Sequence, residues 1–281
     1  MKRRVVIALA LLAGVAAGGS PALADGVNVG KPSSVRNLVP AASVERQAAQ
    51  EYDQLKRQAA ARHALGADDH PQVRRLRAIA ARMIPFTERF NPRARQWHWE
   101  VNLIGSKQIN AFCMPGGKIA FFTGILDTLK LSDDEAAVVM GHEIAQALRA
   151  HARERIAKTE LTRLGASLLS EFVGGGKYSG VFNAGGQLMT LKFSRDDETE
   201  ADTVGLELAA RAGYDPRAGV TLWKKMMAAN KGAPPQWLST HPSGRNRIEE
   251  IERHLPEVMP IYEKARLAEK SRSRQDGDAQ R

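Results

Sequence analysis

Apolar residues recur at helical spacing along much of the chain and alternate with polar residues in only a few short stretches. Residues 41–65 and 71–84 each place apolar side chains every three or four positions, which predicts two helices, the second with Pro71 in its first turn. Residues 96–105 alternate apolar and polar positions and predict a half-buried strand. Residues 118–126 predict a second strand that runs into a helix.

The next stretches of the sequence predict a turn and then a long helix. The proline and glycines of residues 110–117 predict a turn between the two strands. Ser132, followed three positions later by Glu135, forms a capping-box pattern and begins a helix predicted to continue through Lys158. The glycine-rich segment 173–186 interrupts the helical pattern.

The last predicted helices complete the fold class. Residues 195–213 and 215–230 predict two more helices, and no repeat of 20–50 residues is present. The resulting order indicates an α+β fold, mostly helical, with a small sheet beside the long helix. We expect this domain to cover residues 41–262.

The two ends differ in composition from the domain. Residues 1–24 combine a positive start, a short apolar run and a small-residue cleavage site, which is typical of a secretory signal peptide. An uncleaved N-terminal anchor is the alternative. We expect residues 25–40 to be a linker, residues 263–281 to be a charged and disordered tail, and the mature protein to be periplasmic.

The net charge and the cysteine content indicate which binding partners and which covalent links to expect. The formal net charge of +10 is spread along the chain and favours loose peripheral contact with anionic envelope and membrane surfaces. We expect no nucleic-acid partner, because export separates the protein from nucleic acids and the sequence has no nucleic-acid-binding motif. Cys113 is the single cysteine, so it cannot form an internal disulfide, and it fits a packed hydrophobic position better than a nucleophile.

The stretch "GHEIAQALRAH" (141–151) carries the candidate chemistry. His142 and position 146 are four residues apart and therefore lie on one helix face, where two side chains can bind one metal ion. Glu143 can then face a water on that ion. Because position 146 is Gln instead of His, the motif taken alone fits a buried polar pair in a helical core better than a metal site.

A second acidic helix strengthens the metal interpretation. Glu198 and Asp202 are also four residues apart, and they share a face with Leu208 and Ala209, which indicates burial. A zinc site needs a third protein ligand such as Glu198, with the fourth position open to water. Asp202 is placed to orient a ligating imidazole.

Several segments together resemble the zinc metallopeptidase family of HtpX, BepA and the CAAX prenyl endopeptidases, in particular its BepA-like periplasmic branch without helical repeats. The resemblance runs through "WEVNLIGSKQINAFCMPGGKIAFFTGIL", "DDEAAVVMGHEIAQALRAHARER", "SRDDETEADTVGLELAARAGYDP" and "STHPSGRNRIEEI". It covers most of residues 70–255 in the family's order. A gluzincin-type domain is the fold that it implies.

The resemblance also implies roles for individual residues and for one strand. It implies a single Zn²⁺ ion, which the altered motif would bind weakly, with His142, Gln146 and Glu198 as ligands, Glu143 as general base, Asp202 as the support of a ligand, and His241 and Arg247 at the active site. It further implies that an edge strand over residues 117–123 accepts an extended peptide as an added strand. Unfolded polypeptides and the assembly machinery of envelope proteins are the partners that this predicts.

Gln146 leaves three interpretations open. The chain is a zinc endopeptidase acting on unfolded or misassembled envelope proteins with an altered ligand, or an inactive relative that serves as a chaperone or adaptor, or a chain whose natural residue at this position is His. A carbonyl oxygen is a weaker zinc ligand than imidazole. On a continuous helix His151 would point away from the ligand face, whereas His241 could approach from its loop. For His241 we expect a ligand role that keeps the enzyme latent, with an oxyanion donor as the alternative.

Overall fold

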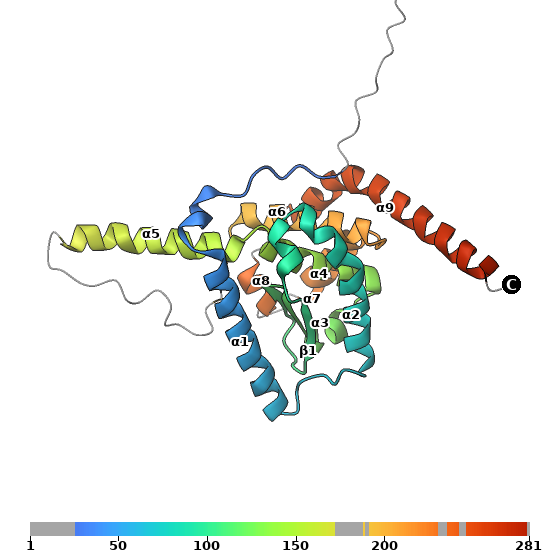
Figure 1. The fold of residues 1–281 in the computed structure, drawn as a ribbon, viewed down its shortest axis with the longest axis horizontal. Helices are drawn as coiled ribbons and strands as arrows, with labels where there is room; N and C mark the ends of the chain where they lie inside the picture. Colours follow the sequence, from blue (N-terminus) through green and yellow to red (C-terminus); the bar gives the residue numbers. More distant parts are fainter. Residues whose placement is uncertain (1–25, 172–187, 189–190, 230–234, 242–245, 280–281) are drawn as a thin grey trace, which may run out of the picture.

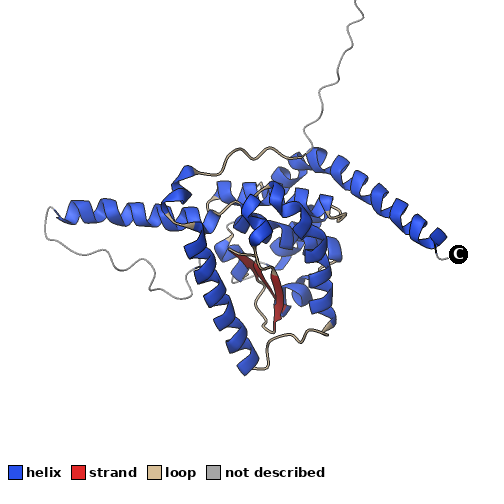
Figure 2. Cartoon of the chain, viewed as in Figure 1, coloured by secondary structure: helices blue, strands red, loops and turns tan. Residues whose placement is uncertain are grey.

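The computed structural model describes residues 26–171, 188, 191–229, 235–241 and 246–279. The predicted signal peptide and the glycine-rich segment 173–186 lie outside these residues. The fold is mostly helical around one small sheet, as the sequence predicts (Figures 1 and 2). Within the described ranges, no helix combines the length and the apolar character that are needed to cross a bilayer.

The sheet has three strands, one more than predicted. They are β1 (Glu100–Ile104), β2 (Ala111–Met114) and β3 (Lys118–Phe122), in the order β1-β3-β2. β3 pairs in parallel with β1 and antiparallel with β2. β3 is therefore the central strand, and the prediction of an edge strand over residues 117–123 is wrong. The edge beside the long helix is β2, which packs on that helix.

The turn between β2 and β3 is shorter than the predicted turn over residues 110–117. Residues 111–114 are apolar and pair as a strand, so only residues 115–117 turn. Gly117 has a φ of +80°, and a β-carbon there would lie 2.7 Å from the Trp99 ring. Glycine is required at this position because both its backbone conformation and the close ring exclude a side chain.

Helices enclose the sheet and form the rest of the core. Before the sheet come a short 3-10 helix η1 (Ser34–Leu38), α1 (Ala41–Ala61) and α2 (Pro71–Met83), then the 3-10 turns η2 (Ile84–Arg89) and η3 (Pro92–Gln96). After it come the elements α3 (Thr123–Leu129), α4 (Asp133–Leu148), α5 (His151–Glu171), α6 (Arg195–Arg211), α7 (Ala218–Ala229), α8 (Gln236–Thr240) and α9 (Arg247–Ala279).

α4 is the central helix of the molecule. It begins at the predicted capping box, in which Ser132 and Glu135 each bond the other's backbone N–H. All residues from Glu135 to Leu148 are buried. Such a helix must be covered on every side, and β2, α2, α6 and α7 pack against it. Its polar side chains therefore face the interior and need partners there.

The predicted long helix breaks after Leu148. Ala150 has a φ of +60°, and α5 begins in a new direction at His151 (Figure 1). Alanine is the strongest helix former, so local preference does not explain the break. Tertiary contacts do: Asn91 Nδ2 donates to the carbonyl of Leu148 at 2.9 Å, and the Arg149 guanidinium donates to Glu200.

The described parts of the expected linker and of the expected tail differ from their predictions. In the expected linker, Val39 is buried and the backbone N–H of Val27 donates to Glu207 at 2.5 Å, so this segment packs on the domain. In the expected disordered tail, α9 continues to Ala279 and extends from the body (Figure 1). Glu269 pairs with Arg82 on α2, and this contact ties the extension to the body.

Candidate metal centre and active site

The residues of the H-E-x-x-Q motif lie inside the protein on α4. His142 and Glu143 are each 2% exposed, and Gln146 is 4% exposed. Their neighbours come from α6, which crosses α4 so closely that Gly141 meets Gly205 backbone to backbone. Polar groups buried this deeply must be satisfied by one another, and the contacts below show how.

His142 is oriented by Asp202, as the sequence predicts for a ligating imidazole. Its Nδ1 lies 2.8 Å from Asp202 Oδ1. Since a carboxylate only accepts, Nδ1 donates to Asp202, and Nε2 is the ring nitrogen that faces the centre. Arg247 donates to both oxygens of Asp202, at 2.6 and 2.7 Å, and so holds the carboxylate in place. Nε2 lies toward Glu198 and His241.

Glu198 lies opposite His142 and is ionised. Burial alone would raise the pKa of this carboxyl, but His142, His241 and Arg247 together lower the pKa to about 2. Arg247 Nη1 donates to Oε2 at 2.6 Å. Arg247 itself stacks over the ring of Trp223, with the guanidinium carbon 4.1 Å from the ring centre. Arg247 thus anchors both Glu198 and Asp202 on α6.

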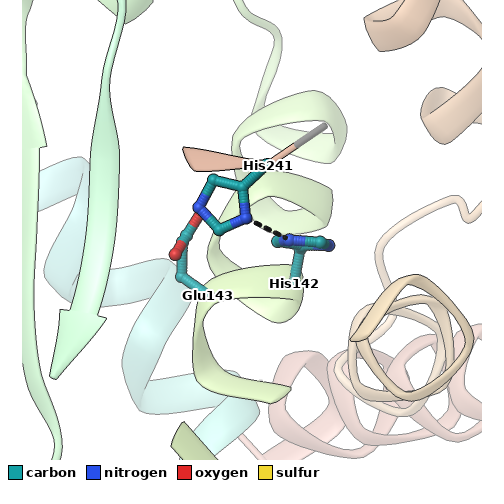
Figure 3. Close-up of side chains that lie close together, drawn as sticks. All are labelled: His142, Glu143 and His241. Atoms are coloured by element: carbon teal, nitrogen blue, oxygen red, sulfur yellow. Dashed lines mark hydrogen bonds and ion pairs between the residues drawn. The ribbon is translucent and has the colours of Figure 1, made fainter. Parts of the chain in front are cut away.

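His241 bridges the two sides of the centre, as Figure 3 shows. Its Nδ1 is 3.2 Å from His142 Nε2 and 2.9 Å from Glu198 Oε1, and its Nε2 is 3.6 Å from Glu143 Oε1. Burial lowers the pKa of His241, but Glu143 and Glu198 outweigh this and raise it. The structure therefore brings His241 into the site directly after α8.

Gln146 does not present a metal-binding atom to the centre. Its amide Nε2 donates to Glu198 Oε1 at 2.8 Å and lies 3.4 Å from His142 Nε2. The side-chain NH₂ group has no lone pair for a metal. Its carbonyl Oε1 instead lies 2.6 Å from His151 Nδ1. The orientation expected for Gln146 as a ligand is thus not the orientation in the structure.

His151 lies beside Gln146, against the prediction that it points away. That prediction assumed a continuous helix, and the break at Ala150 turns His151 back toward α4. Its Nε2 lies 2.5 Å from Glu200 Oε2. The ring is 2% exposed. His151 and Glu200 are site residues that helical periodicity cannot reveal.

Trp237 is a further residue that the sequence analysis missed. Its indole Nε1 donates to Glu143 Oε1 at 2.6 Å. Its ring centre lies 5.0 Å from that of His241 and 5.4 Å from that of His142. The one available signal is its position four residues before His241. Trp237 holds the Glu143 carboxylate in place and packs against one side of the centre.

The donor types of this cluster fit zinc. His142, Glu143 and His241 each offer one ligand atom, all within 4.8 Å of one another. Glu198 is a second carboxylate within reach, with Oε2 3.6 Å from His142 Nε2. Two imidazoles and a carboxylate are a common set for zinc. Either carboxylate completes that set, and neither choice requires Gln146.

A small cavity opens between the centre and β2. It measures about 40 Å³. Its lining includes Glu143, Gln146 and His241, residues of β2, and apolar side chains from outside the sheet such as Phe193. Cys113 on β2 is buried, and this burial raises the pKa of its thiol well above the usual value. A thiol so protonated is not a nucleophile, as the sequence predicts.

Comparison with known proteins places the chain among metallopeptidases. Residues 70–255 match Peptidase family M48. The chain belongs to this family. Similar sequences include the mitochondrial metalloendopeptidase OMA1 of Arabidopsis thaliana, 40% identical over 167 residues, which is 58% of this chain and 33% of that protein. OMA1 of Schizosaccharomyces pombe is 41% identical over 167 residues, 57% of this chain and 48% of that protein.

Two bacterial relatives are less similar to the chain. The metalloprotease LoiP of Escherichia coli is 28% identical over 149 residues, 52% of this chain and 58% of LoiP. The beta-barrel assembly-enhancing protease of the same organism is 28% identical over 173 residues, 57% of this chain and 35% of that protein. The chain spans between a third and about half of the OMA1 sequences. The predicted family is confirmed, and these relatives do not assign the chain to the BepA-like branch.

Proposed function

We propose that the protein is a zinc-dependent endopeptidase. The observation that carries this proposal is the buried cluster of two histidines and two glutamates beside an edge strand, in which His241 lies within reach of both His142 and Glu143. A metallopeptidase needs a metal site, a general base and a place for the peptide.

His142, His241 and Glu198 would hold the zinc ion. When bound, the ion supplies a Lewis acid that polarises the peptide carbonyl and acidifies a water. Asp202 keeps Nε2 of His142 directed inward, because it accepts the hydrogen bond from Nδ1–H. Arg247 holds Asp202 and Glu198 together from behind.

Glu143 is the proposed general base. Trp237 fixes one of its oxygens at 2.6 Å, and the cavity beside β2 reaches the same side chain. A base must be held within reach of the proton that it takes. Glu143 is so held, and it lies between the centre and the place where a peptide would enter.

The peptide would bind along β2. Among the residues that the structure describes, β2 pairs with β3 alone, which leaves its other edge for a further strand. Pairing through the backbone selects extended or unfolded chains with little regard to side chains. We extend the proposal to misassembled envelope proteins in the periplasm and to contact with their assembly machinery and membrane surface, supported by the signal-like residues 1–24 and the net charge of +10.

The orientation of Gln146 supports a second candidate function. Its NH₂ group faces His142 and Glu198, where a metal ligand would need a lone pair. An NH₂ group at this position favours the interpretation that the protein is an inactive relative, which binds peptides along β2 as a chaperone or adaptor. The two candidates share the peptide site and differ in cleavage.

Cleavage of unfolded casein by the full chain distinguishes the two. If the protein is an endopeptidase, Glu143→Gln and chelation of the metal each abolish cleavage. Glu252→Gln, an exposed control on α9, leaves cleavage unchanged. A binding protein shows no cleavage, and both treatments leave casein binding unchanged. Cleavage that persists in Glu143→Gln would exclude Glu143 as the base.

A further inference from the structure

The break between α4 and α5 places a second histidine against the altered motif position. Ala150 adopts a φ of +60°, and His151 then begins α5 with its ring buried against Gln146. Arg149 Nε donates to Glu200 Oε1 at 2.7 Å, and His151 Nε2 contacts the other oxygen of Glu200 at 2.5 Å. Glu200 is thereby fixed, and it fixes the His151 ring.

The contacts of His151 decide which way the Gln146 amide faces. Both ring nitrogens of His151 meet oxygen atoms, Oε2 of Glu200 and Oε1 of Gln146. The Gln146 carbonyl is held at 2.6 Å from Nδ1. Because an amide is planar, the NH₂ group must then face the opposite side, where Glu198 lies 2.8 Å away.

This orientation opposes metal binding. The NH₂ group lies between Glu198 Oε1 and His142 Nε2, 2.8 and 3.4 Å from them. It donates to Glu198 but cannot ligate a cation. A zinc ion that used position 146 would require the amide to rotate so that its carbonyl faces the centre, and this rotation breaks the bond to His151.

We propose that His151, held by Glu200, is a positioning residue that turns the Gln146 amide away from the centre and thereby limits zinc affinity. The inference rests on the proposed function only in taking the same centre as the zinc site. It assigns a role to His151 that the H-E-x-x-Q motif does not contain. It also predicts that weak zinc binding arises from the contact between His151 and Gln146 as well as from the presence of Gln instead of His at position 146.

Zinc titration of the full chain by calorimetry tests this role. His151→Phe keeps a ring of similar size and removes both ring nitrogens. We expect the variant to bind zinc about tenfold more tightly than the parent, which corresponds to about 1.4 kcal/mol, because the freed carbonyl can rotate to the ion. In the Gln146→His background no amide is left to turn, and His151→Phe should leave zinc affinity unchanged.

The same titration can overturn the inference. An unchanged or lower affinity of His151→Phe would overturn it, as would a rise of equal size in the Gln146→His background, since His151 would then act without the amide. Should His151→Phe not fold, as judged by circular dichroism, Glu200→Gln carries the test. It removes the carboxylate that holds the ring, and we expect a rise of about threefold, or about 0.7 kcal/mol.

The outcomes also separate this inference from the proposed function. Zinc binding by Gln146→His, with no response of the Gln146 parent to either variant, overturns the role of His151 and leaves the function standing. Absence of zinc binding in the parent, in Gln146→His and in His151→Phe overturns both.

Discussion

Gly141 and Gly205 face each other where α4 crosses α6, and no side chain separates the two backbones. A β-carbon on Gly205 would lie 2.6 Å from the backbone nitrogen of His142, and one on Gly141 would lie 2.5 Å from the carbonyl oxygen of Gly205. Real β-carbons do not approach backbone atoms this closely. The contact brings α6 near enough for Asp202 to reach His142 at 2.8 Å.

Gly205→Ala should therefore destabilise the fold and disturb the centre together. We expect the free energy of unfolding to fall by about 1–3 kcal/mol, the usual cost of overpacking a core, and zinc affinity to fall with it. Urea unfolding and calorimetry measure the two. Thr199→Ala, at an exposed position of the same helix, should change stability by less than about 0.5 kcal/mol. Equal stability of Gly205→Ala and the parent would contradict the close contact.

Gln146→His should strengthen zinc binding. An imidazole presents a lone pair where the amide presents NH₂, and nitrogen is the better zinc ligand. We expect affinity to rise at least tenfold, or about 1.4 kcal/mol, as measured by calorimetric titration. Equal affinities of the two proteins would show that position 146 does not contact the ion.

His241→Ala should have opposite effects on binding and on turnover. In the parent, His241 supplies the second imidazole, 3.2 Å from His142 Nε2, so its loss should lower zinc affinity. In the Gln146→His background, zinc affinity should change little. Casein turnover there should rise, because a ring that bridges the metal site and Glu143 holds the enzyme latent.

The alternative role for His241 predicts another pattern. An oxyanion donor would leave zinc affinity unchanged in both backgrounds and would lower turnover on removal. A zinc-bound structure with both His241 ring nitrogens more than about 4 Å from the ion would also count against the ligand role, since a Zn–N bond measures about 2.0–2.1 Å.

Acid should destabilise the metal-free protein through Glu198. Its pKa is about 2 in the folded protein and ordinarily 4.5, so the ionised form favours folding. The contribution is complete above about pH 4.5 and is lost as the pH falls toward about 2. The linkage amounts to about 3 kcal/mol. Urea unfolding in chelator from pH 6 to pH 3 should show a decline that Glu198→Gln reduces. An unchanged slope in that variant would contradict the assignment.

Part of the site could be found in the sequence because its members share helix faces. His142 and position 146 are four residues apart on α4, and Glu198 and Asp202 are four residues apart on α6. Helical geometry alone brings each pair together. The capping box at Ser132 likewise depends on residues three positions apart, and it is present as predicted. Their chemical roles stay predictions that the experiments above address.

What the sequence by itself determined is therefore local: the helices, the metal-motif face and the acidic face, and the family to which they belong. Only the tertiary structure decided that β2 and not β3 is the edge, because strand order depends on pairing between distant segments. Only it decided that α4 ends at Leu148, because contacts from Asn91 and Glu200 override the helical preference of the chain there. That break brings His151 to Gln146, and no periodicity encodes it, since the bonds that turn the backbone come from residues about 50 or more positions away.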